Sequence, residues 1–388
     1  LALLINTGKG KLLPTSLPYE NKPELIYSTA SFGDIDQDGL LDLYVGGYGH
    51  WHTPKKPAQS LLFYQHKDGW VNKSQKLPHH FYDLSALFTD IDQDNDVDLY
   101  IANDLNYPDL IYRNDHGSLV FENKSSSKGL LSSHNSMSID SGDIHNDLIL
   151  DLFITDDASS KTQYEHLKIL KSGQQSLAGE SRRKVDDIIQ LAQALKQKSP
   201  TDCLQLKNQF MFFQCMDILR LEAKWLLQRE GGQAQVNNQS CHFPSCIQSN
   251  NELPPIAVNK KPFAAIKTNN LLLAGKGLGH FKWQQGGYDA TDWTWSGKFV
   301  DMNNDGWQDL LITNGMIDEQ YYQSTISNLY YQNNTQGQLN DQSTKSGFNL
   351  NEPSKGLSLA DLDNDGDVDV IVGASESQPY FYKNNSCK

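Results

Sequence analysis

Asp34-Ile-Asp36-Gln-Asp38-Gly39-Leu-Leu-Asp42 carries oxygen-bearing side chains at relative positions 1, 3, 5 and 9 and a turn residue at position 6. The pattern returns in four further copies along the chain: Asp90-Ile-Asp92-Gln-Asp94-Asn95-Asp96-Val-Asp98, Asp143-Ile-His145-Asn-Asp147-Leu148-Ile149-Leu-Asp151, Asp301-Met-Asn303-Asn-Asp305-Gly306-Trp307-Gln-Asp309 and Asp361-Leu-Asp363-Asn-Asp365-Gly366-Asp367-Val-Asp369. An apolar, β-rich run such as Leu43-Tyr-Val45 follows every copy. Such self-similarity indicates a repeat architecture.

The spacing of these side chains is that of a calcium-binding loop. Ca²⁺ takes six to eight oxygen ligands, and a tight loop supplies carboxylates at alternate positions and a backbone carbonyl at position 7. Position 7 is chemically mixed, as expected if only its carbonyl binds: Leu40, Asp96, Ile149, Trp307 and Asp367. A strand pattern follows each loop, so this is not an EF-hand. The alternative is a set of solvated Asp-rich turns.

We expect four bound Ca²⁺ ions and leave a fifth open. The open site is the third copy, where His145 and Leu148 replace the usual oxygen ligand and turn residue. The acids need a cation nearby, since unpaired carboxylates gathered in one short loop repel one another.

The distance between copies predicts a β-propeller. Roughly 55 residues separate neighbouring copies, the length of one four-stranded blade. An apolar strand entering a polar hairpin turn recurs between the loops, for example Leu110-Ile-Tyr-Arg113-Asn114 and Tyr380-Phe-Tyr-Lys383-Asn384. We therefore predict a mainly β fold with blades in residues 1–160 and 268–388. The number of blades and the closure of the ring stay open.

These residues resemble a known repeat. The stretch from Phe32 to Val45 is similar to the FG-GAP/VCBS repeat, the blade of integrin-α-like β-propellers. The stretch from Asp292 to Gly315, with its Trp-rich strand and fourth loop, resembles the cartilage-acidic-protein-like (ASPIC/UnbV) group. The resemblance covers about residues 1–157 and 268–388. It implies a calcium-clipped propeller that binds proteins or glycans through its faces, and it implies no catalysis.

Residues 161–267 interrupt the repeat. Apolar side chains recur there at helical spacing, from Val185 to Leu195 and from Leu206 to Leu226, and predict an antiparallel helical hairpin between blades three and four. Four consecutive large apolar residues, Phe210, Met211, Phe212 and Phe213, go around the second helix. They form either part of a self-contained core or a docking surface for another chain.

Four of the five cysteines lie in the same segment. In an exported protein they predict two disulfides, with Cys203 to Cys246 and Cys215 to Cys241 one of three possible pairings. Zinc is the alternative, but the spacing lacks paired C-x-x-C knuckles. Cys387 is left over.

Composition narrows the function. The formal charge of -14 disfavours nucleic acid, and no stretch is apolar enough to span a membrane. Common catalytic motifs, including G-x-S-x-G and H-E-x-x-H, are absent from the sequence. Because the chain opens without Met, we expect a processed product or a fragment of a longer protein.

The sequence as a whole predicts a non-enzymatic, calcium-stabilised adhesion or binding module, located extracellularly, on the cell surface or in the periplasm. The alternatives are a structural subunit of a surface polymer or multiprotein complex and a propeller-scaffolded enzyme acting on polysaccharide. The ligand, the oligomeric state and the source organism are not defined by the sequence.

Overall fold

The structure, a computed structural model, describes the greater part of the repeat region. It covers residues 3–8, 10–20, 22–50, 57–77, 81–104, 107–122, 128–133, 135–157, 266–267, 269–291, 293–315, 327–375 and 377–386. These belong to one unit, Leu1–Ala158 together with Phe263–Lys388. The predicted helical hairpin, its four cysteines and residues 210–213 lie outside the described residues.

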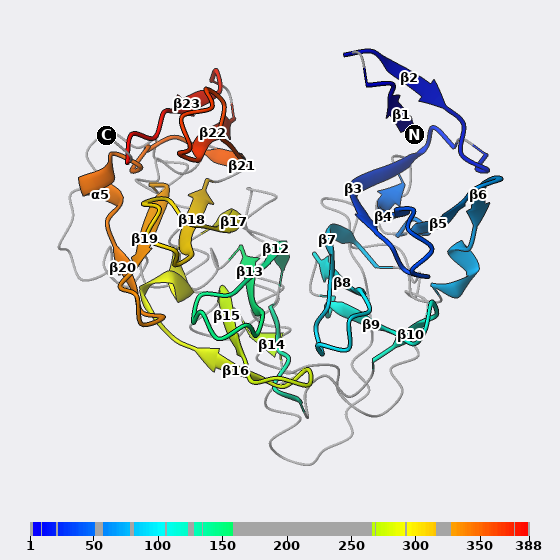
Figure 1. The fold of residues 1–388 in the computed structure, drawn as a ribbon, viewed down its shortest axis with the longest axis horizontal. Helices are drawn as coiled ribbons and strands as arrows, with labels where there is room; N and C mark the ends of the chain where they lie inside the picture. Colours follow the sequence, from blue (N-terminus) through cyan, green and yellow to red (C-terminus); the bar gives the residue numbers. More distant parts are fainter. Residues whose placement is uncertain are drawn as a thin grey trace, which may run out of the picture. The chain divides into compact units, whose positions relative to one another are not determined.

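Five antiparallel sheets, one for each loop, make up this unit (Figure 1). Blade 1 contains β3 (Leu25–Gly33), β4 (Asp42–His50), β5 (Leu61–His66) and β6 (Gly69–Asn72), and blade 2 contains β7 (Asp83–Thr89), β8 (Asp98–Asn103), β9 (Leu110–Asn114) and β10 (Leu119–Phe121). Blade 3 contains β12 (Ser136–Gly142), β13 (Asp151–Asp156), β15 (Leu271–Gly275) and β16 (Phe281–Gln284). Blade 4 contains β17 (Thr294–Val300), β18 (Asp309–Asn314), β19 (Leu329–Asn333) and β20 (Leu339–Asp341). Blade 5 contains β21 (Ser354–Ala360), β22 (Asp369–Ala374) and β23 (Tyr380–Tyr382).

The remaining elements are short. β1 (Leu3–Asn6) pairs with β2 (Leu12–Thr15), and β11 (Ser132–Ser133) pairs in parallel with β14 (Ile266–Lys267). Helical turns occur at η1 (Ser74–Lys76), η4 (Gly287–Ala290) and α5 (Ser343–Ser346). In the described part of the chain, no helix is long and apolar enough to cross a membrane.

The second strand of each blade begins at the last residue of a loop. The apolar runs that follow the loops form these strands, and β8, β13 and β18 are buried along their whole length. Burial on both faces explains why these runs are continuously apolar instead of alternating. The strands predicted after each loop are therefore confirmed.

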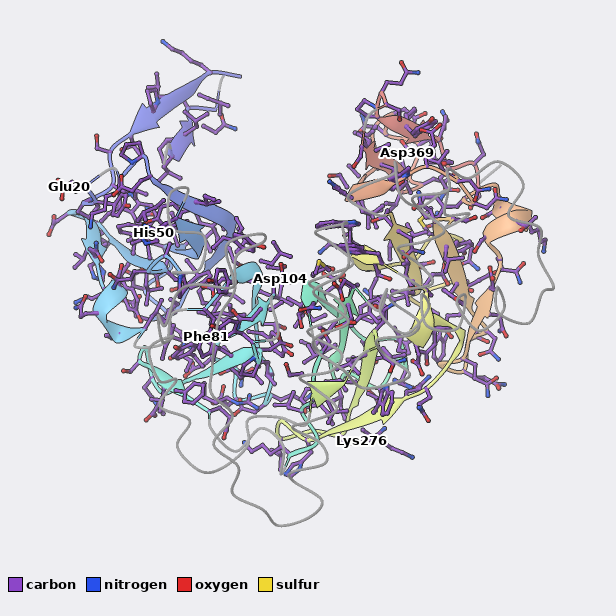
Figure 2. The ribbon with its side chains drawn as sticks, turned by 180° about the vertical axis from the view of Figure 1, so that it is seen from behind. Glu20, His50, Phe81, Asp104, Lys276 and Asp369 are labelled. Atoms are coloured by element: carbon purple, nitrogen blue, oxygen red, sulfur yellow. The ribbon has the colours of Figure 1, made fainter. Side chains whose placement is uncertain are left out.

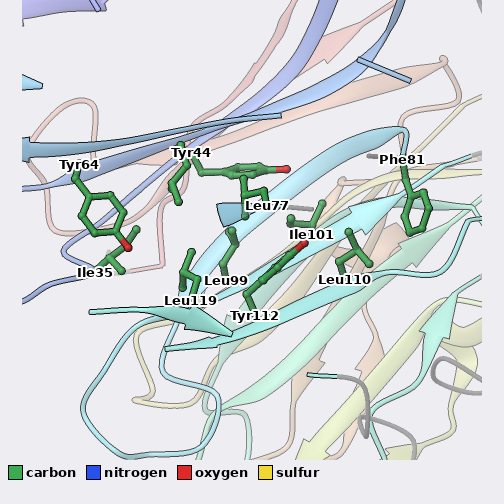
Figure 3. Packing of buried hydrophobic residues seen from close by; sticks show 11 residues of the cluster. Ile35, Tyr44, Tyr64, Leu77, Phe81, Leu99, Ile101, Leu110, Tyr112 and Leu119 are labelled. Atoms are coloured by element: carbon green, nitrogen blue, oxygen red, sulfur yellow. The ribbon is translucent and has the colours of Figure 1, made fainter. Parts of the chain in front are cut away.

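Apolar side chains from neighbouring sheets form the core. Figure 3 shows the cluster between blades 1 and 2, where Tyr44 and Leu62 pack against Leu99, Ile101 and Tyr112. Similar clusters join blades 2 and 3, blades 3 and 4, and blades 4 and 5. The first strands also contact one another in the order β3, β7, β12, β17, β21. This is the arrangement of a five-bladed β-propeller.

The position of the insertion differs from the sequence-based prediction. β13 pairs directly with β15, with Leu152 opposite Leu273 and Ile154 opposite Leu271. The inserted residues therefore leave the fold between the second and third strands of blade 3, and the prediction that they lie between blades three and four was wrong. The sequence pattern identifies Leu271–Gly275 as a strand of the repeat. Only the pairing across the sheet shows that its partner is β13.

Candidate metal sites

The five repeated loops each join the first strand of a blade to the second. We number them loops 1 to 5, residues 34–42, 90–98, 143–151, 301–309 and 361–369. Because the blades are antiparallel meanders, all five loops lie at the same end of their sheets, which we call the loop end. The connections between second and third strands lie at the opposite end.

Hydrogen bonds within each loop fix its shape. In loop 1, Asp34 accepts from the backbone N–H groups of Asp38 and Gly39 at 3.1 and 3.0 Å, and Asp38 accepts from Leu40 N at 2.9 Å. The same three bonds occur in loops 2 to 5. Positions 4 and 6 have positive φ, for example 56° at Gln37 and 85° at Gly39. This requirement explains the Gly and Asn preference at position 6.

The aspartate at position 9 anchors the loop to its blade. Asp42 accepts from Ile35 N at 2.9 Å and from Gln65 N on the third strand at 2.8 Å. Equivalent pairs of bonds hold Asp98, Asp151, Asp309 and Asp369. All five aspartates are 0 to 1% exposed. Burial raises the pKa of Asp42, Asp98 and Asp309 to about 6, although the backbone N–H groups act to lower it.

Position 3 presents oxygen atoms that lack partners. Among the described residues, Asp36 Oδ1, Asp92 Oδ1 and Asn303 Oδ1 are buried without a hydrogen bond. Leaving a buried acceptor unsatisfied costs free energy, so three such atoms at one repeat position call for a ligand. A hard cation fits, because carboxylate and amide oxygens are the donors that Ca²⁺ prefers.

The carboxylates around position 3 converge. Ligand atoms of Asp34, Asp36 and Asp42 lie within 4.8 Å of one another in loop 1. The same holds for Asp90, Asp92 and Asp94 in loop 2, and for Asp361, Asp363 and Asp369 in loop 5. The structure thus brings three of the predicted side chains together in each of loops 1, 2 and 5. Binding by these groups, and by the carbonyls of position 7, remains a prediction.

Loop 3 is closed by a histidine. His145 Nδ1 lies 2.9 Å from Asp151 Oδ2, and its Nε2 lies 3.0 Å from Gln284 Oε1 on the fourth strand of the blade. The hydrogen bond to Asp151 raises the pKa of His145 above its usual range. Leu148 is forced to a φ of 64° with its side chain exposed. This loop therefore has fewer oxygen donors than the others, as its sequence indicated.

Three basic side chains near the loops were missed by the sequence analysis. His66 Nδ1 lies 3.4 Å from Asp38 Oδ2 in loop 1, and Arg113 Nη1 lies 2.8 Å from Asp98 Oδ2 in loop 2. Lys383 pairs with Asp363 in loop 5. The available signal was position within the blade: Arg113 and Lys383 each precede an Asn at the end of a third strand.

Side-chain amides connect each loop to the next. The residue at position 4 donates to the backbone carbonyl at position 6 of the following loop: Gln37 to Asn95 at 3.0 Å, Gln93 to Leu148 at 2.9 Å, Asn146 to Gly306 at 3.4 Å and Asn304 to Gly366 at 3.4 Å. The five loops therefore form a connected row along the loop end.

Neither a scan against protein-family models nor a search of curated proteins found a match for this chain.

Proposed function

We propose that this chain is a calcium-stabilised β-propeller of the FG-GAP/VCBS type, related to the cartilage-acidic-protein-like (ASPIC/UnbV) group. The observation that carries the proposal is the buried, partnerless oxygen at position 3 of loops 1 and 4. When bound, Ca²⁺ neutralises the gathered carboxylates. The chain's own residues hold the loop against the blade.

We further propose that the protein works as a binding or adhesion module outside the cytoplasm, at the cell surface or in the periplasm, and is not an enzyme. Millimolar calcium is found in such compartments, and weak loops of this kind suit that concentration. The repeat resemblance and the cysteine content of the insertion support the placement. The docking role of residues 210–213 and the pairing of the four cysteines belong to this proposal.

Calcium binding is tested by counting ions on the full chain after dialysis and by thermal unfolding with excess EDTA, Ca²⁺ or Mg²⁺. We expect several ions per chain and a rise in melting temperature with Ca²⁺, as mass action requires for an ion that binds only the native state. Absence of both would show that the loops are plain turns.

Matched substitutions at position 5 locate the ions. Asp38→Asn and Asp305→Asn keep the acceptor that holds the loop but remove a charge, so each should weaken calcium binding by one site. Asp147→Asn makes the same change in loop 3, where His145 closes the site, and should leave the ion count unaltered.

Binding is tested with the full chain on a glycan array and against extracellular protein extracts, with Ca²⁺ and with EDTA. We expect calcium-dependent retention of a glycan or protein. Replacing Phe210 and Phe213 by Ala, with the melting temperature monitored, should weaken protein capture if the insertion docks a partner. Turnover of polysaccharide by the same sample would instead support an enzyme.

A further inference from the structure

Arg113 places a cation inside loop 2. It lies on β9, and its Nη1 is 2.8 Å from Asp98 Oδ2 and 3.3 Å from Asp92 Oδ2. Arg113 is only 9% exposed. The guanidinium therefore contacts the buried anchor at position 9 and the carboxylate at position 3 together, which is where a metal ion would have to bind.

The equivalent residues of the other blades do not do this. Equivalent positions in the five blades can be aligned on the residue whose backbone N–H donates to the anchor aspartate at position 9. These residues are Gln65, Asn114, Gly275, Asn333 and Asn384. The residues that precede these are Tyr64, Arg113, Ala274, Gln332 and Lys383. Lys383 is 41% exposed and contacts positions 3 and 5 of loop 5, so it stays at the rim, away from the anchor.

The neighbouring blade encloses the guanidinium. A Cβ added at Gly279, in the hairpin of blade 3, would lie 2.4 Å from Arg113 Nη2 and 3.1 Å from Asp92 Cβ. Gly279 has a φ of 69°. A glycine therefore satisfies both the backbone conformation of the turn and the close approach of Arg113. A buried guanidinium this close to Asp92 and Asp98 opposes a divalent cation, since like charges repel strongly where water is excluded.

The other acids of loop 2 do not compensate for the repulsion between Arg113 and a divalent cation. Asp90 uses both carboxylate oxygens on backbone N–H groups of its own loop. Asp96 accepts hydrogen bonds from the side-chain amide of Gln37 and from the backbone N–H of His116. Nε and Nη2 of Arg113 have no hydrogen-bond partner among the described residues, so no other group competes for this cation.

We propose that Arg113 is the resident cation of loop 2, which is clipped to its blade by the guanidinium and takes no calcium, whereas loops 1 and 4 take an ion. The comparison with loops 1 and 4 rests on the proposed function, because it assumes that these two loops bind calcium. It reduces the number of ions expected per chain by one and makes blade 2 insensitive to chelators.

A reciprocal exchange with blade 4 tests this. Arg113→Gln gives loop 2 the residue of blade 4, and we expect one additional Ca²⁺ per chain, a lower melting temperature in EDTA and recovery with Ca²⁺. Gln332→Arg should lose one ion. It should also weaken tryptophan-sensitised Tb³⁺ emission, because Trp307 lies in loop 4. Arg113→Lys keeps the charge and should keep the wild-type ion count.

The outcomes separate the two proposals. If the wild type binds calcium and Arg113→Gln gains no ion, or if Asp94→Asn lowers the wild-type count, the resident-cation proposal is wrong. If no variant binds calcium, the proposed function fails, and unfolding in EDTA decides on Arg113 alone. Destabilisation by Arg113→Gln that Arg113→Lys rescues then supports the proposal, and equal melting temperatures overturn it.

Discussion

Buried aspartates occur at both ends of the blades, and two of them, Asp42 and Asp83, are held in different ways. At the loop end, Asp42 is fixed by two backbone N–H groups of its own blade. At the opposite end, Asp83 of blade 2 accepts from the hydroxyls of Tyr44 and Ser60 of blade 1. A backbone N–H requires an acceptor, whereas a hydroxyl can turn and accept instead. Asp42 must therefore keep an acceptor toward both N–H groups, whereas the hydroxyls around Asp83 can adapt to a protonated acid.

Each end also has its own surroundings. Asp369 lies in the fifth blade (Figure 2) and belongs to the loop end, while Asp104, which accepts from Tyr48 at 2.8 Å, belongs to the opposite end. There the aromatic rings of Tyr48, Tyr82 and Tyr107 pack together. These aromatic rings surround part of the opposite end, whereas the loop end carries the five carboxylate-rich loops, so the two ends should respond differently to substitution and chelators.

The largest effect is expected at a loop-end anchor. Asp42→Ala leaves two backbone N–H groups without acceptors, and we expect a loss of about 2 to 5 kcal/mol in unfolding free energy, with or without calcium. Asp83→Ala should cost less, because hydroxyls can turn to other acceptors. Urea unfolding measures both. Equal losses would remove the distinction between the two ends.

The pH dependence should be smaller, and a substitution at Asp83 separates its share from that of the loop-end anchors Asp42, Asp98 and Asp309, whose pKa is also raised to about 6. Burial raises the pKa of Asp83 to about 6, above its ordinary value near 4 in the unfolded chain. The folded state therefore binds the proton more tightly, and the stabilisation present below about pH 4 is lost as the pH rises through 6. We expect a fall of about 3 kcal/mol from this group.

Asp83→Asn cannot ionise and serves as the comparison. Unfolding free energies at pH 4 to 7 in EDTA should fall less steeply for this variant than for the wild type. Parallel curves for the two proteins would contradict the raised pKa of Asp83.

A third prediction concerns contact between blades at the loop end. A Cβ at Gly337, in the hairpin of blade 4, would lie 2.5 Å from His145 Cδ2 in loop 3, at a φ of 73°. Gly337→Ala should therefore cost about 2 kcal/mol through crowding and backbone strain. Gly39→Ala has a φ of 85° but open space around it, so about 1 kcal/mol is expected. Comparing the melting temperatures of Gly337→Ala and Gly39→Ala separates the cost of the close approach from the cost of the backbone conformation.

The smallest effect should come from the amide links. Gln37→Ala removes the exposed bond to Asn95 O, with an expected cost of about 0.5 kcal/mol. Its more informative consequence is on calcium titration by calorimetry, where weaker coupling of loop 1 to loop 2 should alter the shape of the isotherm. An isotherm identical to that of the wild type would show that the loops act independently.

Much of the fold follows from local pattern. Loop positions 1, 3, 5 and 9 predicted where each second strand begins, and β8 and β18 start at Asp98 and Asp309 accordingly. Hairpin strands such as Leu110–Asn114 were also recognised, since turn chemistry and alternation are short-range signals. The location of the insertion was not, because the pairing of β13 with β15 joins residues more than a hundred positions apart.

The sequence by itself determined the loops, their charge and the strands that follow them, because φ preferences and carboxylate spacing act within a few residues. Tertiary structure decided what each carboxylate does. It made Asp42 an anchor and left Asp36 Oδ1 without a partner. It also brought Arg113 to loop 2 and set His145 of loop 3 between Asp151 and Gln284. Those roles arise from contacts between strands and between blades, whose distances no local pattern encodes.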